Sequence, residues 1–409
     1  MGNTSLQHID NLASPCHGET NLEGRSLQAH MGLGRMASVP APPLDVYLIA
    51  DDLTGALDTA AQFVPLVGEI DVFWRPVEHD GSVALDLGVR EATESEAVAN
   101  VAVARGARAA GALKYLKLDS LLRGHTAALI ATWWSAGSFE HCIVAPAFPV
   151  QGRITRGGRQ YVRDESGWQP VACDLGLALS QRGLAVAYRR PGDQAPRGVS
   201  LWDAETDEDL RSIAAAARAV VGSTLWCGSG GLAGALSFGG SVVGVRAAAS
   251  RPVLGLFGSD HRVTRAQLEA CGPATMLLPN GGVASAARVN QRLGDFRDVL
   301  AQIEVPARAS RAEAARLIER EFDELLSRVT RPAALFVSGG ATLRSVCTAL
   351  DADHLTVSGQ ILTGVPWSVL RGGRFDGVPV ISKSGAFGDG ELLRRILGLN
   401  SLVEKRDAP

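Results

Sequence analysis

Apolar runs of strand length alternate with alanine-rich amphipathic stretches along most of this 409-residue chain. The run VYLIA at 46–50 precedes a stretch of helical periodicity at 55–67, and the runs DVFW, SVALDLG and LKYLKL follow it. Strands that alternate with helices of this length are typical of βαβ units around a parallel sheet. The pattern therefore predicts an α/β fold with mainly parallel strands and flanking helices.

The alternation is interrupted twice, which indicates two lobes. Residues 152–197 are rich in glycine, arginine and turn residues, and the stretch 238–250 lacks a clear period. We expect a first domain at 45–240 and a second at 250–405, each with its own mainly parallel sheet and with a ligand site in the cleft between them. Residues 1–44 are polar, glycine-rich and aperiodic, so a disordered N-terminal extension is expected there.

Composition and charge argue against several classes of function. Apolar residues make up 46% of the chain and charged residues 20%, with a net charge of -3 and no basic run, unlike a typical nucleic-acid-binding protein. No apolar run reaches the ~18 residues that span a bilayer, and the N-terminus lacks a secretory pattern. Six scattered cysteines without CxxC spacing fit a reducing compartment. We therefore expect a cytoplasmic protein without nucleic-acid or membrane partners.

Two adjacent aspartates, Asp51 and Asp52, follow the first apolar run in the stretch LIADDLTG. Like charges at the end of a buried strand repel, and burying them costs free energy unless a positive or hydrogen-bonding group meets them. Asp52 or Thr54 could cap the helix that follows, but capping explains only one of the two acids. The pair therefore indicates that at least one carboxylate serves a ligand.

A second polar cluster, in LKLDSLLRGH, contains Lys117, Asp119, Ser120 and Arg123 at the end of another strand. In a strand, Lys117 and Asp119 point to the same side. The cluster suits a small polyhydroxy acid, because an arginine fork can bind a carboxylate and an aspartate can accept from hydroxyls. A salt-bridged strand end would explain these residues equally well. The later stretch PAFPVQGRITRGG could be a mobile basic loop that closes over an anion, or simply a hairpin.

Three glycine-rich turns in the second half each follow an apolar run and precede a helical stretch. They are FGS at 257–259, FVSGGATLRSV at 336–346 and ISKSGAFGDGELL at 381–393. Backbone N–H groups at a helix N-terminus bind anions well when no side chain obstructs them, and Lys383 adds a positive charge. The three turns predict a nucleotide or phosphate site. The motifs GxxxxGK[ST] and GxGxxG are absent, so neither a P-loop nor the usual dinucleotide site is expected.

The motifs ADDLTGALDTA, KLDSLLRGH, PAFPVQGR, GSGGLA, GGAT and KSGAFGD occur in the order found in the four-carbon acid sugar kinase family. The chain resembles this family over about residues 46–400. Members phosphorylate threonate, erythronate and 3-oxo-tetronate-type acids with ATP. The resemblance implies that the 45–240 domain binds the sugar acid, that the 250–405 domain binds ATP, and that Mg²⁺ accompanies the nucleotide.

The resemblance also implies roles for individual residues, taken position by position. The expected substrate-binding residues are Asp51, Asp52, Arg90, Lys117, Asp119, Ser120 and Arg123. Asp52 and Asp119 are the expected catalytic residues, and Asp51 stays open as a third candidate for the carboxylate that accepts the hydroxyl proton. The expected ATP-binding residues, with Lys383 added from the glycine turns, are Ser259, Gly339, Gly340, Ala341, Thr342, Lys383 and Gly385.

Three positions depart from the family pattern and leave the substrate open. Ala341 replaces the acid of GG[DE]T, Thr363 replaces the proline of a Pro-Gly pair, and Val89 replaces a serine beside Arg90. Alternatives are a kinase for another short acid such as 3-oxo-isoapionate, an NAD-dependent sugar-acid oxidoreductase, or a non-catalytic sugar-acid-binding protein. The metal ligands, the hydroxyl that is phosphorylated and the presence of a homo-oligomer also stay open.

Overall fold

The computed structural model describes residues 45–105, 112–237, 250–258, 261–279, 281–306 and 308–398. The expected N-terminal extension therefore lies outside the described residues. So do Ser259 and most of the stretch between the two expected domains.

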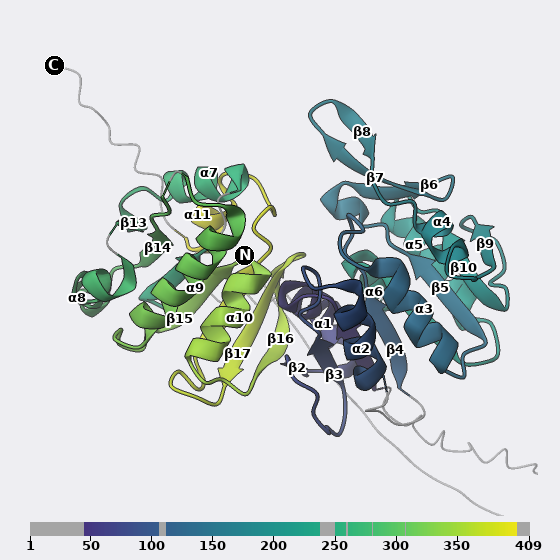
Figure 1. Ribbon diagram of the computed structural model, residues 1–409, viewed down its shortest axis with the longest axis horizontal. Coiled ribbons are helices and arrows are strands. Elements are labelled where there is room, and N and C mark those ends of the chain that lie inside the picture. The colour runs from purple at the N-terminus through teal and green to yellow at the C-terminus, as the bar shows by residue number, and fades with distance from the viewer. Residues whose placement is uncertain are drawn as a thin grey trace, which may run out of the picture. The chain divides into compact units, whose positions relative to one another are not determined.

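The main sheet is built from strands of both halves of the chain. The first half contributes β1 (Val46–Ala50), β2 (Ile70–Phe73), β3 (Val83–Asp86), β4 (Leu113–Lys117), β5 (His141–Ala145), β9 (Val186–Arg189), β10 (Gly198–Trp202) and β11 (Thr224–Gly228). The second half contributes β12 (Val253–Phe257), β13 (Thr275–Leu278), β14 (Val299–Ile303), β15 (Ala334–Ser338), β16 (His354–Leu362), β17 (Val365–Arg371) and β18 (Pro379–Lys383). Within the described residues these 15 strands form one sheet, in the order β13-β14-β12-β15-β18-β17-β16-β2-β3-β1-β4-β11-β5-β10-β9 (Figure 1).

Most neighbouring strands are parallel, as the sequence predicts, but the two halves do not form separate sheets. The strand β17 lies between β16 and β18 and pairs antiparallel with both. The strand β2 also pairs antiparallel with β16, with Val72 opposite Leu355 and Ile70 opposite Val357. An apolar run predicts that a strand exists but not which edge it joins, so this junction could not be read from the sequence. The α/β class and the mainly parallel pairing are confirmed, and the expectation of two separate sheets is wrong.

Helices cover both faces of the sheet. They are α1 (Leu53–Val67), α2 (Glu94–Ala104), α3 (Thr126–Ala136), α4 (Leu175–Ser180), α5 (Asp207–Arg218), α6 (Gly230–Leu236), α7 (Arg262–Ala270), α8 (Gly281–Gly294), α9 (Arg311–Leu326), α10 (Gly340–Ala349) and α11 (Leu392–Ile396). The helices α1, α5, α6, α8, α9 and α10 share one apolar core, which is continuous across both halves of the chain. The helices α2, α3 and α4 pack on the opposite face, and α7 and α11 form a smaller core with the second half. Alternate residues of β1 point into the two cores, as expected for a strand buried on both faces.

The glycine- and arginine-rich stretch forms a small sheet of its own. After the short 3-10 helix η1 (Pro149–Gln151), the strands β6 (Arg153–Arg156), β7 (Arg159–Asp164) and β8 (Gly167–Pro170) make an antiparallel meander. Figure 1 shows the β7–β8 hairpin projecting from the first half. Of the two interpretations of this stretch, the hairpin is the one that the fold supports.

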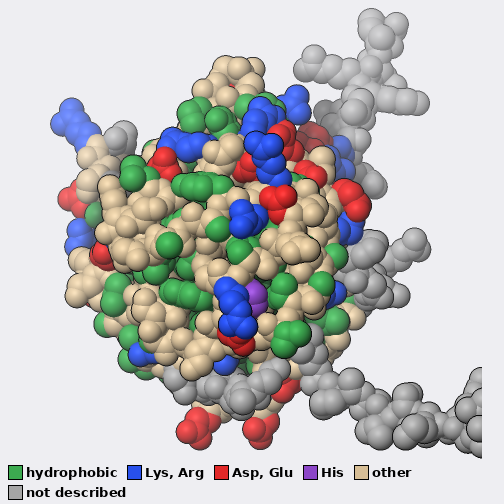
Figure 2. Space-filling view, turned by 90° about the vertical axis from the view of Figure 1, so that its right-hand side faces the viewer, with side chains coloured by type: hydrophobic (Ala, Val, Ile, Leu, Met, Phe, Trp, Pro, Cys, Tyr) green, Lys and Arg blue, Asp and Glu red, His purple; other side chains and the backbone are tan. Residues whose placement is uncertain are grey.

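No helix in the described part of the chain is both long and apolar enough to cross a membrane. Figure 2 shows the face that lies to the right in Figure 1, where acidic and basic side chains are interspersed with small apolar groups among the described residues.

The junction between β2 and β16 is a buried part of the core, so it can be tested by truncation. Leu355 is fully buried, and Leu355→Ala should lower the free energy of unfolding by about 2–5 kcal/mol, the usual cost of a Leu cavity in a core. The matched control is Leu277→Ala on β13, where the side chain is 47% exposed and the expected change is under about 0.5 kcal/mol. Urea denaturation measures both, and equal small changes would contradict a buried junction.

Candidate functional site

Parallel strands bring the predicted residues to one edge of the sheet. The strands β3, β1 and β4 are neighbours in the first half, and β12, β15 and β18 are neighbours in the second. Ligands of open α/β sheets bind beyond the carboxyl ends of such strands. A cavity of about 690 Å³ opens there, lined by residues of both halves. Its lining includes Asp51, Asp52, Arg90, Lys117, Asp119, Ser120, Arg123, Gly339, Gly340, Ala341, Lys383 and Gly385.

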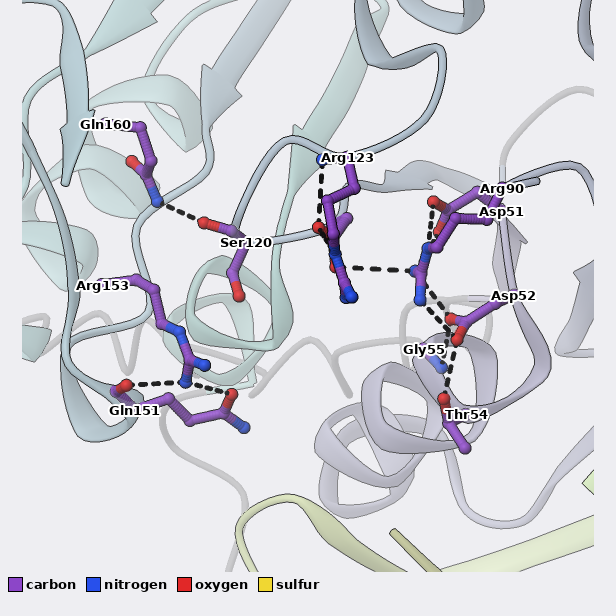
Figure 3. A network of polar contacts seen from close by, with 11 residues as sticks. Asp51, Asp52, Thr54, Gly55, Arg90, Ser120, Arg123, Gln151, Arg153 and Gln160 are labelled. Atoms are coloured by element: carbon purple, nitrogen blue, oxygen red, sulfur yellow. Dashed lines mark hydrogen bonds and ion pairs between the residues drawn. The ribbon is translucent and has the colours of Figure 1, made fainter. Parts of the chain in front are cut away.

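The acidic pair shares one arginine, Arg90, which follows β3 (Figure 3). The Arg90 Nε and Nη2 donate to the two carboxylate oxygens of Asp51 at 2.9 and 2.7 Å. Its Nη1 and Nη2 also donate to Asp52 at 2.6 and 2.8 Å. Each of its three nitrogens therefore contacts the pair, and the guanidinium offsets the repulsion between two carboxylates.

Asp52 also caps α1, which explains why this helix begins at Leu53 rather than at the expected residue 55. Its Oδ1 accepts from the Gly55 N–H at 2.8 Å, and its Oδ2 accepts from the Thr54 hydroxyl at 2.8 Å. Burial by itself would raise the pKa of the Asp52 carboxyl, but Arg90 and Lys117 hold this pKa below its usual value. Asp52 is therefore an anion that both stabilises the helix and faces the cavity.

Lys117 lies in the cavity wall at the end of β4, and glycine at position 55 makes room for it. A Cβ added at Gly55 would lie only 2.9 Å from the Lys117 Nζ and 2.5 Å from the Asp52 Oδ1. The Lys117 side chain is buried, yet among the described residues its ammonium makes no hydrogen bond or ion pair. Its positive charge is therefore available to a ligand.

Asp119 and Arg123 pair with each other, as the alternative interpretation of their motif expects. The Arg123 Nε and Nη2 donate to the Asp119 carboxylate at 2.8 and 2.7 Å. Burial would raise the pKa of Asp119, but the hydrogen bonds from Arg123 and the charge of Arg90 hold it well below its usual value. Ser120 beside them has its backbone carbonyl fixed by the Gln160 side chain at 2.8 Å, and Figure 3 shows its hydroxyl pointing away from that contact.

The glycine turn at the start of α10 lies directly against the acidic pair. A Cβ added at Gly340 would lie 2.9 Å from the Asp52 Oδ2 and 3.2 Å from the Thr54 hydroxyl. Gly339 has a φ of 105°, a conformation that favours glycine. The backbone N–H groups at the N-terminus of α10 therefore lie beside Asp52. Thr342 does not line the cavity, and its hydroxyl instead abuts Gly258 at the end of β12.

Lys383, at the end of β18, holds the third glycine turn in shape. Its Nζ donates to the backbone carbonyls of Ser384 at 2.9 Å and Gly385 at 3.2 Å. Burial lowers the pKa of Lys383 to about 8. The Gly385 carbonyl also accepts from the Thr264 hydroxyl of α7 at 2.8 Å. Lys383 lines the cavity, and its hydrogen bonds also order the loop.

Three cavity residues were not selected from the sequence. Asp58, in the second turn of α1, has a buried Oδ1 without a partner among the described residues, and desolvation raises its pKa to about 6. Arg153 begins β6 inside the PAFPVQGR stretch, which was considered only as a loop. Arg344 of α10 donates to the buried Asp86 at the end of β3 at 2.6 Å, which ties the two halves together. The ADDLTGALD stretch contains Asp58, but the spacing between Asp52 and Asp58 did not distinguish Asp58 from an ordinary helix residue.

Known protein families match both halves of this arrangement. A sugar-binding N-terminal domain model matches residues 46–174, and a nucleotide-binding C-terminal domain model matches residues 254–393. The acidic and basic cluster lies within the first match, and the glycine turns of α10 and β18 lie within the second. The fold and the cavity thus define an α/β protein of the sugar- and nucleotide-binding class.

Relatives narrow this class to a family. The chain is 31% identical to a D-threonate kinase of Bordetella bronchiseptica, over 85% of this chain and 95% of that protein. It is 30% identical to a 3-oxo-tetronate kinase of Pseudomonas fluorescens, over 86% of this chain and 96% of that protein. A crystal structure from Salmonella typhimurium LT2 has the same fold, with a TM-score of 0.68 at 20% identity, covering 86% of this chain and 98% of that one. The chain belongs to the four-carbon acid sugar kinase family.

Asp58 should make the stability of the protein depend on pH. Because its folded pKa of about 6 is above the usual 3.8, its contribution to stability is fully present below about pH 4 and is lost as the pH rises through 6. The size is on the order of 3 kcal/mol. Asp58→Asn removes this titration, so the variant should gain stability relative to the wild type as the pH rises from 4.5 to 7.5. Urea denaturation across this range checks it, and parallel curves for the two proteins would contradict it.

Proposed function

We propose that this protein transfers the γ-phosphoryl group of ATP to a hydroxyl of a four-carbon sugar acid such as threonate, erythronate or a 3-oxo-tetronate. One observation carries the proposal. The acidic pair after β1 and the glycine turn of α10 meet in a single cavity, where Gly340 approaches the Asp52 carboxylate. A kinase needs this proximity, because the acceptor hydroxyl must lie in line with the phosphoryl group.

In this proposal the first-half residues hold and orient the acid. Asp51, Asp52 and Asp119 accept hydrogen bonds from its hydroxyls, with Ser120, Arg90 and Arg123 completing the polar wall. Asp52 or Asp119 accepts the proton as the phosphoryl group moves. Their arginine partners keep both carboxylates ionised, which makes them weak bases. A weak base suffices, because phosphoryl transfer depends mainly on positioning and charge stabilisation.

ATP would occupy the glycine turns of the second half. The N-terminus of α10 at Gly339 to Thr342 and the loop held by Lys383 at Gly385 offer backbone N–H groups to phosphates, and Ser259 is proposed to join them. Ala341 lies in the cavity wall where the family pattern has an acid, so that contact to the nucleotide is missing. Lys117 is suited to the charge that develops on the transferred group.

Mg²⁺ would enter bound to ATP and neutralise phosphate charge when present. No group of three or more His, Cys, Asp or Glu side chains within the described ranges could hold a metal ion. A Mg²⁺ ion that keeps several waters needs only one or two protein carboxylates. Asp58 fits this need, because its Oδ1 has no partner among the described residues and it lines the cavity.

The domain division at 45–240 and 250–405 belongs to the same proposal, with sugar-acid and nucleotide lobes that flank the cavity. Closure of the lobes around both substrates would exclude water, whose attack would waste ATP. The pair of Arg344 and Asp86 links the two halves beside the cavity.

Release of ADP tests the proposed function. The purified full chain is incubated with ATP and Mg²⁺ and with D- and L-threonate, D- and L-erythronate, their 3-oxo forms and 3-oxo-isoapionate. ADP release stimulated by one acid would identify the substrate. Reduction of NAD with a sugar acid, or calorimetric binding of an acid without ADP release, would instead favour one of the two alternatives from other classes.

Asp52→Asn should separate catalysis from folding. Asparagine caps a helix as well as aspartate does and leaves Arg90 paired with Asp51, so the variant should fold, with a lower unfolding midpoint because the ion pair of Asp52 with Arg90 is lost. Turnover should fall by about 100-fold or more, the usual scale for losing proton transfer assistance. Asp174→Asn is a matched control, since Asp174 caps α4 and pairs with Arg159 but does not line the cavity. Turnover within about threefold of the wild type in Asp52→Asn would remove Asp52 from the chemistry.

A further inference from the structure

We propose that Arg153 binds the carboxylate of the sugar acid, and this inference rests on the proposed function. Arg90, Lys117 and Arg123 are the cations among the substrate-binding residues expected from the sequence. The contacts around these three cations, and those around Arg153, favour Arg153 for this task.

Two of the three expected cations already have carboxylate partners in the protein. Arg90 uses each of its nitrogens on Asp51 and Asp52, and its side chain is only 15% exposed. Arg123 places its Nε and Nη2 on Asp119. A substrate carboxylate at either arginine would have to displace a protein carboxylate or lie beside it, and like charges in contact repel. Arg90 therefore offers no vacant pair of donors, and an anion at the remaining N–H groups of Arg123 would lie beside the Asp119 carboxylate.

The Lys117 ammonium has no ion-pair partner among the described residues, but it is poorly placed for the carboxylate of the sugar acid. Its ammonium lies over Gly55, beside the Asp52 Oδ1, and Asp52 is also the residue that Gly340 approaches. Lys117 thus lies at the end of the cavity where the nucleotide turn arrives. A single ammonium there suits a phosphoryl oxygen, whereas a planar carboxylate is recognised best by a two-pronged guanidinium.

Arg153 has unused donors and, among the described residues, no carboxylate partner. Its Nη1 donates to the backbone carbonyl of Gln151 at 2.6 Å and to the Gln151 Oε1 at 3.0 Å, which fixes the direction of the side chain. Its buried Nε has no hydrogen-bond partner, and within the described residues the guanidinium makes no ion pair. Arg153 is half-buried, and a buried N–H without a partner is costly, so a ligand carboxylate would satisfy an existing need.

The surroundings of Arg153 fit the polar end of a sugar acid. Figure 3 shows Arg153 and Ser120 on one side of the site and the cluster of Arg90, Asp51 and Asp52 on the other, with Arg123 between them. Burial lowers the pKa of Arg153, and Asp119 is the acid that opposes this effect. A short acid with its carboxylate at Arg153 would extend its hydroxyls past Asp119 towards Asp52 and the nucleotide turn.

A different role for Arg153 would be structural, through its two contacts with Gln151 in η1. The two roles differ in what they do to ligands without a carboxylate. If Arg153 binds the carboxylate, its loss should weaken the binding of the sugar acid only. If Arg153 only shapes the turn, its loss should weaken the binding of the acid and of the corresponding four-carbon sugar alcohol by the same factor.

The experiment compares Arg153→Met with the wild type in the ADP-release assay. The readouts are kcat and KM for the accepted acid, KM for ATP, and the inhibition constant of the matching tetritol, which lacks the carboxylate. We expect the acid KM to rise roughly 10- to 150-fold, the scale of a lost charged hydrogen bond. The tetritol constant and the ATP KM should change less than about twofold, and Arg153→Lys should recover part of the loss.

Arg156→Met is the matched control, because Arg156 ends the same strand, is exposed and pairs with Glu205 away from the cavity. It should leave all four quantities unchanged. An unchanged acid KM in Arg153→Met, or a tetritol constant that rises by the same factor, would overturn the inference. If the wild type turns over no acid, the proposed function fails. Calorimetric titration with the acids then tests whether Arg153 binds their carboxylate. Binding lost only in Arg153→Met supports it, and equal or absent binding in both proteins overturns it.

Discussion

The contact between Arg90 and the two aspartates after β1 is the interaction on which the site depends. Two carboxylates at the end of a buried strand repel each other, and burial adds a desolvation cost for each. One guanidinium meets both of them, at 2.6–2.9 Å, and so allows the chain to keep two anions at the same strand end. The pair fixes the start of α1 through the Asp52 cap, and it fixes the loop after β3 that carries Arg90. The start of α1 and the negative charge in the cavity therefore both depend on the contact between Arg90 and the aspartates.

The cavity contains two kinds of positive charge with different consequences. Arg90 and Arg123 form ion pairs with aspartates, and these ion pairs give the cavity wall a fixed shape. Lys117 and Arg153, within the described part of the chain, keep donors that no protein group uses. Preorganised charges of this second kind act on a ligand without first having to leave a partner. The distinction depends on contacts and not on residue type, so counting basic residues in the motifs could not have made it.

Much of the fold and part of the site could be predicted from the sequence, for identifiable reasons. Apolar runs and capping residues locate most of the parallel strands and most helices, and glycine turns after strands locate the second-half loops. The strands β9, β13 and β14 and the helix α8 were missed, and so were the antiparallel strands β16 and β17, because alternation of strands and helices does not predict an inserted hairpin. Asp51, Asp52, Lys117 and Asp119 were found because the strand ends bring them together. Arg153 was missed because a sequence pattern does not show which donors of a guanidinium stay without a partner.

The junction of β2 with β16 has a consequence for how the protein is made. The hydroxyl of Thr356 in β16 donates to Asp71 in β2 across a sequence separation of 285 residues. During synthesis β2 emerges long before β16, so its hydrogen-bonding edge stays open while the intervening residues are translated. An unpaired strand edge is a template for wrong pairing with another chain. Late pairing between distant segments is also slow. We therefore expect nascent first halves to be the form most prone to aggregation, and chaperone binding to matter most during this interval.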